Sequence, residues 1–318
     1  MVNFPYHTEL QKINMSIQKQ IRQTLTFAVA LATLSMVSIG CGEADSTNNH
    51  EVENSDPATS KIEVAKRTKT LKKIFRAAPS PMETARIIQK EGVSFNPENL
   101  CGVELASKDG LSSDYAISLG LLGADLSYAS IYRKNSIALS YLEAVKTLSQ
   151  ELGVGSVLNN ELIGRAEANR ANRDSVVTLV SRAFYDLNEK LKSVGHEDLS
   201  GLVVASGWIE GLYLATRELE GSSDNYKTLI AEQKLILVDV MSLIESYKES
   251  PAIEGMIQQL QPVVTAFEGV TYGESAEITA KKKDGAIYIG GGKEYFADEN
   301  TIQAITTAIT TLRNNLIQ

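Results

Sequence analysis

Two pairs of an acid and a tyrosine are the most unusual side chains of this sequence. Asp125 precedes Tyr128 in YAISLGLLGADLSYASIY, and Glu210 precedes Tyr213 in LVVASGWIEGLYLATRELE. Both segments are apolar on several faces, which is typical of buried helices, and a spacing of three places each acid beside its tyrosine. A buried carboxylate must be paired or hydrogen-bonded. Two interpretations stay open: a buried polar network that fixes helix packing, or a polar patch lining a ligand pocket.

An offset of 85 residues relates the two segments. The aligned pairs are Asp125 and Glu210, Tyr128 and Tyr213, and Tyr141 and Tyr226. The same order of helices follows each segment. We therefore predict an internal duplication of residues 115–195 and about 200–268, with the alternative ligand pocket between the two repeats.

Signatures of known catalytic and metal sites are missing from the sequence. It contains no GxSxG, CxxC or HExxH motif, and its few histidines leave no plausible Ser-His-Asp set. The run GGGK at 290–293 lacks the spacing of a phosphate-binding loop, and the polar run at 196–198 is typical of a loop between helices. We predict no catalytic residue, no metal site and no cofactor.

The stretch from Leu25 to Cys41 decides where the chain resides. Basic Lys19 and Arg22 precede an apolar run that ends in a small residue and a cysteine. This arrangement resembles a bacterial lipoprotein signal, although Ser38 stands where such signals prefer leucine. The alternative is an uncut transmembrane anchor, which is disfavoured because the run is short and interrupted by Thr and Ser. Translation could begin at Met1 or at Met15.

The resemblance implies that residues 1–40 are removed as a signal peptide and that Cys41 is lipidated, with palmitate among the expected acyl chains. Two acyl chains hold a protein stably on a membrane. Gly42 after the cysteine implies the outer membrane of a cell envelope, with the chain periplasmic or surface-exposed. Residues 41–60 are rich in Asn, Ser, Glu and Asp, which predicts a disordered tether.

The net charge limits the possible binding partners, and the cysteine count limits the possible disulfides. Loss of residues 1–40 changes the net charge of −8 to −10, which argues against nucleic acid as a partner. Cys101 is then the only cysteine not used by the lipid, so no intramolecular disulfide forms. Its apolar neighbours Leu100 and Leu105 predict a buried and inert thiol rather than a reactive one.

Residues 61–318 read as a single predominantly helical domain. Apolar residues recur at spacings of three and four along most of this range, which predicts an all-α fold: a multi-helix bundle or two stacked helical repeats. The expected helices include a basic one over 61–76, a long one over 159–192 and a last one over 302–316. Alternation around Asp284-Gly285 predicts a small β-hairpin near 276–296.

The runs GLLGADLSYASIY, SYLEAVKTLSQELGV, SPMETARIIQKEGV and ASGWIEGLYLAT, within residues 75–250, resemble a family of uncharacterised helical envelope lipoproteins. The resemblance implies a fold class and a location but no activity. Two hypotheses follow. The protein is a non-enzymatic scaffold that is anchored to the membrane and binds a protein partner in the envelope, or it binds a small molecule around Asp125 and Glu210.

Overall fold

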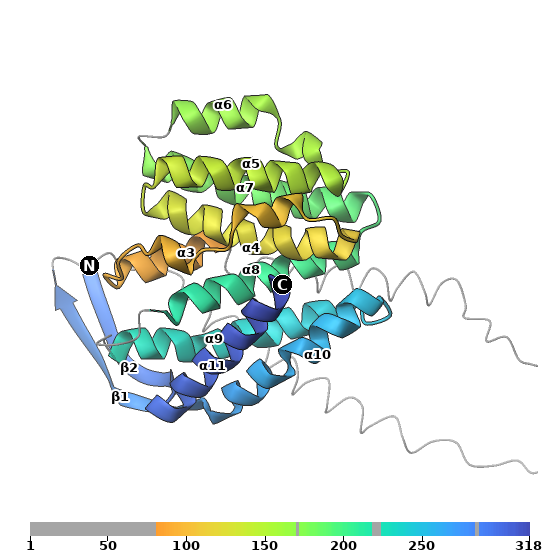
Figure 1. The fold of residues 1–318 in the computed structure, drawn as a ribbon. Helices are drawn as coiled ribbons and strands as arrows, with labels where there is room; N and C mark the ends of the chain where they lie inside the picture. The colour runs from red at the N-terminus through yellow and green to blue at the C-terminus, as the bar shows by residue number, and fades with distance from the viewer. Residues whose placement is uncertain (1–80, 170–171, 218–223, 284–285) are drawn as a thin grey trace, which may run out of the picture. The chain divides into compact units, whose positions relative to one another are not determined.

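A computed structural model describes residues 81–169, 172–217, 224–283 and 286–318 of the chain. The expected signal peptide (1–40), the lipidated Cys41, the tether (41–60) and the basic helix over 61–76 lie outside these residues. The described chain is helical apart from one β-hairpin, which confirms the predicted fold class (Figure 1). None of its helices is both long enough and apolar enough to span a bilayer.

Most of the described chain belongs to regular helices and strands. In chain order they are α3 (Pro81–Lys90), η1 (Pro97–Asn99), η2 (Val103–Ser107), α4 (Ser112–Ile131), α5 (Asn135–Glu151), η3 (Gly155–Val157), α6 (Asn160–Ala168), α7 (Arg173–Ser193), α8 (Glu197–Ala215), α9 (Asp224–Glu245), α10 (Pro251–Ala266), η4 (Phe267–Gly269), β1 (Thr271–Lys283), β2 (Ala286–Phe296) and α11 (Glu299–Leu316). The η elements are short 3₁₀ helices.

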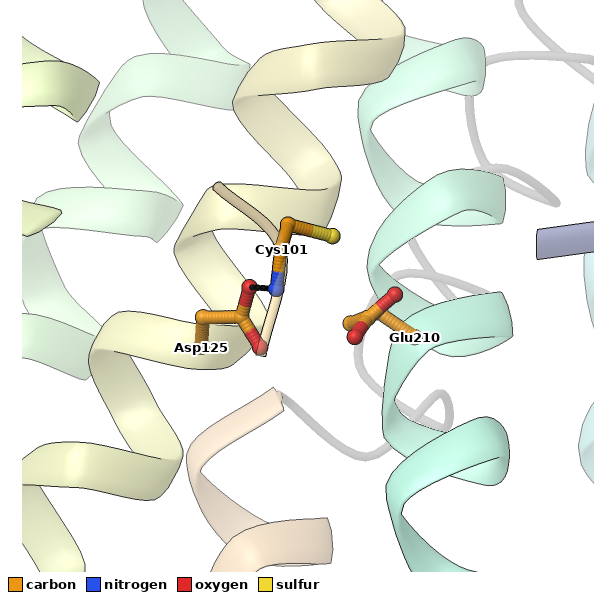
Figure 2. A group of neighbouring side chains, drawn as sticks. All are labelled: Cys101, Asp125 and Glu210. Carbon is orange, nitrogen blue, oxygen red and sulfur yellow. Dashed lines mark hydrogen bonds between the residues drawn. The ribbon is translucent and has the colours of Figure 1, made fainter. Parts of the chain in front are cut away.

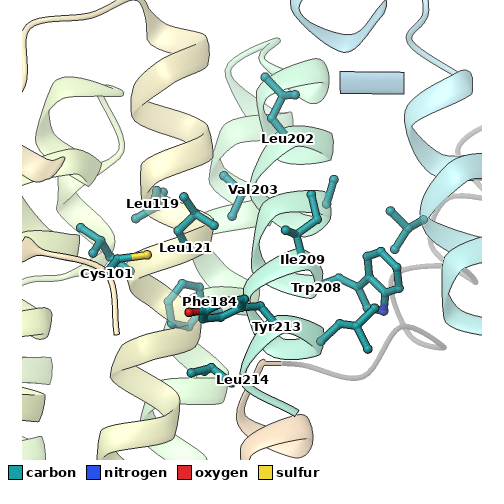
Figure 3. Packing of buried hydrophobic residues seen from close by; sticks show 14 of the residues in the cluster. Cys101, Leu119, Leu121, Phe184, Leu202, Val203, Trp208, Ile209, Tyr213 and Leu214 are labelled. Carbon is teal, nitrogen blue, oxygen red and sulfur yellow. The ribbon is translucent and has the colours of Figure 1, made fainter. Parts of the chain in front are cut away.

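Helices α4 and α8 form the centre of the helical body. They pack against each other, and almost every residue of α8 from Leu199 to Ala215 is buried. Their backbones approach closely at Gly120, where a Cβ would lie 2.4 Å from the carbonyl oxygen of Val203. Apolar side chains of both helices fill the remaining space (Figure 3). The all-round apolar pattern of the two segments therefore corresponds to two buried central helices, as predicted.

The other helices cover this central pair. Helices α3, α5 and α7 pack against α4, and α9 and α11 pack against α8 (Figure 1). These outer helices are amphipathic, and α11 buries Ile302, Ile305 and Ile309 at the predicted spacing. The sequence periodicity thus sets which face of each outer helix points inward.

The expected helix over 159–192 is wrong, because the structure has two helices there, α6 and α7. Asparagine side chains account for the break. The side chain of Asn159 accepts a hydrogen bond from Leu162 N–H, and that of Asn172 accepts one from Ser175 N–H. Asparagine satisfies the free N–H groups of a helix's first turn, so a run rich in Asn favours a new start over a continuous helix.

The β-hairpin is present and begins earlier than expected, at Thr271 rather than 276. At its base the rings of Tyr272 and Tyr295 lie 4.8 Å apart. Residues 278–290 of the hairpin belong to a unit separate from the helical body. The GGGK run of the sequence lies within strand β2, which agrees with its rejection as a phosphate-binding loop.

The predicted duplication has partial parallels in the structure. Tyr141 and Tyr226 are both buried, and each hydroxyl donates a hydrogen bond to a backbone carbonyl. The acceptors are not equivalent, however: Cys101 precedes α4, whereas Ala215 lies in the last turn of α8. The duplication therefore stays a prediction.

Candidate functional site

Four side chains from distant parts of the sequence meet between α4 and α8. Cys101 lies in the loop between η1 and η2, Asp125 in the middle of α4 and Glu210 in α8 (Figure 2). Arg313, near the end of α11, completes the cluster. Asp125 and Glu210 have no exposed surface, and Cys101 and Arg313 are 2% and 6% exposed. Charged groups so fully buried must compensate one another.

Arg313 neutralises one of the two acids. Its Nε lies 3.1 Å from Oε2 of Glu210, and its Nη2 lies 3.4 Å from Oε1 of the same carboxylate. The same Nη2 is also 3.3 Å from the carbonyl oxygen of Asn99 and 3.2 Å from Sγ of Cys101. The guanidinium therefore ties α11 to α8 and to the loop that carries Cys101.

Asp125 is only half satisfied. Its Oδ2 accepts a hydrogen bond of 2.9 Å from the backbone N–H of Cys101, whereas its Oδ1 is buried without a hydrogen-bond partner among the described residues. The hydroxyl of Tyr141 donates to the carbonyl of Cys101 and so holds the loop from the other side. A buried polar atom without a partner is unusual enough to require an explanation.

Burial sets the protonation of this cluster. Burial, and then the neighbouring charge of Glu210, raise the pKa of Asp125 well above its usual range. Burial also raises the pKa of Glu210, while the charge of Arg313 opposes that rise. Burial raises the pKa of the Cys101 thiol as well, which agrees with the predicted inert cysteine. Burial thus favours the neutral forms of Asp125 and of the Cys101 thiol, while Arg313 favours the ionised form of Glu210.

The two predicted tyrosines contact different groups. The ring of Tyr213 lies 4.5 Å from the guanidinium carbon of Arg313, so it covers the charged cluster through a cation–π contact. Tyr128 points elsewhere: its hydroxyl donates to the carbonyl of Ser94 at 3.2 Å, and its ring stacks on Phe95. Asp125, Glu210 and Tyr213 therefore share one neighbourhood, and Tyr128 instead fixes the segment after α3.

Sequence reasoning missed Arg313 and did not connect Cys101 to the acids. Arg313 occupies the position four residues after Ile309, on the buried face of α11, and a charge on that apolar stripe was the available signal. The thiol of Cys101 and one carboxylate oxygen each of Asp125 and Glu210 lie within 4.8 Å of one another. Thiol sulfur and carboxylate oxygen can both coordinate a metal, although no spacing motif in the sequence indicates such a site.

A separate cavity lies on the other side of α4, among α4, α5, α6 and α7. It has a volume of about 400 Å³. Most of its lining is apolar: Leu126, Ala138, Leu139, Leu142, Val145, Leu158, Leu162, Ala166, Val176, Leu179, Val180, Ala183, Phe184 and Leu187. Its polar lining residues are Ser130, Asn135, Ser136 and Glu167. None of the four predicted site residues lines this cavity.

A second hollow, of about 550 Å³, lies between α10 and α11. Its lining combines small and amide side chains, among them Ala304, Thr307 and Gln259. In the polar run at 196–198, His196 occupies the N-cap position of α8 without a side-chain capping hydrogen bond, and the carboxylate of Asp198 accepts a 2.9 Å hydrogen bond from the Ser250 hydroxyl. The interpretation of 196–198 as a loop between helices is therefore wrong for Glu197 and Asp198, which form the first turn of α8.

Comparison of the chain with protein-family models, with curated proteins and with solved structures found no match. The resemblance to envelope lipoproteins therefore stays a prediction that rests on sequence segments within residues 75–250. The charged cluster and the cavities are the features from which a function can be inferred.

Proposed function

We propose that this protein is a lipid-anchored, non-enzymatic envelope protein whose helical domain binds a small amphipathic molecule in the cavity among α4, α5, α6 and α7. The observation that carries the proposal is the predominantly apolar cavity of about 400 Å³. Small-molecule sites commonly have volumes of about 300–1,000 Å³, with apolar walls and a few polar groups that orient the ligand. The proposal keeps the ligand-binding hypothesis but moves the pocket away from Asp125 and Glu210.

The distribution of polar groups favours a ligand with one polar end. Ser130 lies in the last turn of α4, and Asn135 and Ser136 lie in the first turn of α5, so these three are neighbours at one end of the cavity. Figure 1 shows the end of α6, which carries Glu167, on the same side as the turn between α4 and α5. The carboxylate of Glu167 would favour a cationic head group, while the apolar remainder would enclose an alkyl chain or small ring system.

Anchoring through Cys41 would complement such a role. Amphiphiles concentrate in bilayers, so a binder held at the membrane surface meets its ligand at high local concentration. The acidic body opposes broad contact with anionic head groups, which leaves the lipid as the expected attachment.

Photolabelling of the full-length chain in lipid nanodiscs tests the proposal. The probe is a dodecylamine that carries a diazirine in its alkyl chain, and labelled peptides are identified by mass spectrometry. We expect labels on α5, α6 and α7. Ala166→Phe, which fills the cavity, should remove most of this labelling, because the added ring occupies the space of the probe.

The matched control is Ala168→Phe, which places the same ring two residues away on an exposed position of α6 that does not line the cavity. This variant should label like the wild type. A dodecyl sulfate analogue should label less than the amine, and Glu167→Gln should reduce that difference. Labels outside α4–α7, or labelling that Ala166→Phe leaves unchanged, would contradict the proposal and favour a scaffold that binds a protein partner.

A further inference from the structure

The charged cluster between α4 and α8 combines three potential metal ligands with an unexplained polar atom. Cys101 Sγ, one oxygen of Asp125 and one oxygen of Glu210 lie within 4.8 Å of one another and come from three different elements. Figure 2 shows the thiol and both carboxylates directed into the same space between the two helices. Oδ1 of Asp125, fully buried there, has no hydrogen-bond partner in the part of the chain that the structure describes.

No described group lies in hydrogen-bonding geometry to this oxygen, although the Cys101 thiol and the Glu210 carboxylate are close enough to influence the carboxyl group of Asp125. The backbone N–H of Cys101 satisfies Oδ2 of Asp125, and the guanidinium of Arg313 is directed to Glu210, Asn99 and Cys101 rather than to Asp125. A buried polar atom of this kind costs free energy unless something binds it. A cation bound by the three converging donors would supply the missing partner.

We propose that Cys101, Asp125 and Glu210 bind one divalent cation of the Zn²⁺ type, independently of the α4–α7 cavity. One thiolate and two carboxylates form a mixed sulfur and oxygen ligand set, which suits Zn²⁺ and its analogue Co²⁺ better than Ca²⁺ or Mg²⁺. In a tetrahedral Zn²⁺ site the sulfur and oxygen ligands are about 3.6 Å apart, as follows from the usual bond lengths. Closing by about 1 Å lies within the reach of these side chains.

The charges of the cluster also balance when a cation binds. With a divalent cation bound to one thiolate and two carboxylates, three negative ligands offset the two charges of the cation and the one of Arg313. Arg313 gives up its contact with Sγ and keeps Glu210 and Asn99, in the manner of outer residues that orient metal ligands.

Cobalt substitution tests the site. Because the site is closed, the full-length chain is produced in cells supplied with Co²⁺ and purified in a mild detergent. We expect one Co²⁺ per chain by elemental analysis and a thiolate-to-Co²⁺ absorption band in the near ultraviolet, which Zn²⁺ abolishes. Cys101→Ser should remove the band and weaken binding by more than the roughly 10–100-fold that loss of an outer partner causes.

The chain supplies its own control, because Cys41 is its one other cysteine. Cys41→Ser should retain the band and the stoichiometry. Circular dichroism and the Co²⁺ content of the wild type keep the result interpretable if Cys101→Ser folds poorly. Wild-type protein without stoichiometric Co²⁺, or a band that survives Cys101→Ser, would overturn the proposal and leave the cluster as a neutral carboxyl packed beside an ion pair.

Discussion

The two sides of helix α4 differ in how closely they are packed and in the side chains that they bury. Asp125 is buried beside Cys101 and Glu210 of α8, whereas the next residue, Leu126, lines a predominantly apolar cavity among α4, α5, α6 and α7. The α8 side closes because Gly120 lets the two backbones approach. The difference shows that close packing on one face leaves buried polar groups dependent on one another and on any bound ion, while wider spacing on the other face leaves volume for a ligand.

Arg313→Met should have the largest effect on the closed side. It removes the partner of Glu210 and leaves that acid buried without compensation, which typically costs about 3–5 kcal/mol. Chemical denaturation followed by the fluorescence of Trp208 measures the change, because this single tryptophan is buried in α8.

The matched control for this substitution is Arg182→Met. Arg182 pairs with Asp186 on the surface, where its side chain is 69% exposed, so its loss should cost at most about 0.5 kcal/mol. Equal effects of the two substitutions would mean that the buried Arg313–Glu210 pair contributes no more to stability than the exposed Arg182–Asp186 pair. The closed side of α4 would then not depend on a buried ion pair.

Gly120→Ala should have the next largest effect. The added Cβ would lie 2.0 Å from Ser206 Oγ and 2.4 Å from the carbonyl oxygen of Val203, so α4 and α8 must separate. Overpacking of this kind costs about 1–3 kcal/mol. Thermal unfolding of the variant measures it.

Gly164→Ala provides the opposite expectation, because a Cβ at Gly164 in α6 meets nothing of the described chain within 4 Å. Replacement of glycine by alanine inside a helix then gains roughly 0.5–1 kcal/mol. A neutral Gly120→Ala would contradict the close approach of α4 to α8, and a destabilising Gly164→Ala would contradict the open space at Gly164.

Asp125→Asn should cost less than about 1 kcal/mol, since an amide has the shape of a neutral carboxyl and its oxygen can accept from Cys101 N–H. The expectation follows from burial, which raises the pKa of Asp125 and favours its protonated form. Urea denaturation of wild type and variant in metal-free buffer measures the difference. A loss as large as that of Arg313→Met would show that Asp125 is ionised in the folded protein.

The sequence predicted the fold better than it predicted the site. The apolar faces of α4 and α8 and the stripe of α11 follow from local periodicity, which residue spacing records directly. The break between α6 and α7 was not predicted, because asparagine side chains that cap a new helix compete with a continuous polar helix.

The place of Arg313 and Cys101 in the charged cluster was not predicted, for a different reason. They join Asp125 and Glu210 only through packing between residues far apart in the chain, and no local spacing encodes such a meeting. The acids themselves were recognisable, because a charge inside an all-apolar helix stands out in any sequence.

The smallest effect is expected at the start of α11, far along that helix from Arg313. The side chain of Asp298 caps the helix by accepting a 2.8 Å hydrogen bond from Thr301 N–H, and this interaction lowers the pKa of Asp298. An acid whose pKa is lowered by folding stabilises the protein above its unfolded pKa and loses that contribution as pH falls through the folded pKa. Asp298→Asn keeps the cap but removes the charge. The variant should therefore be slightly less stable than the wild type at pH 7, and the difference should vanish in acid, as thermal unfolding at both pH values would show. A difference that persists in acid would mean that the Asp and Asn caps differ in their hydrogen bonding to the first turn of α11 rather than in the charge of Asp298.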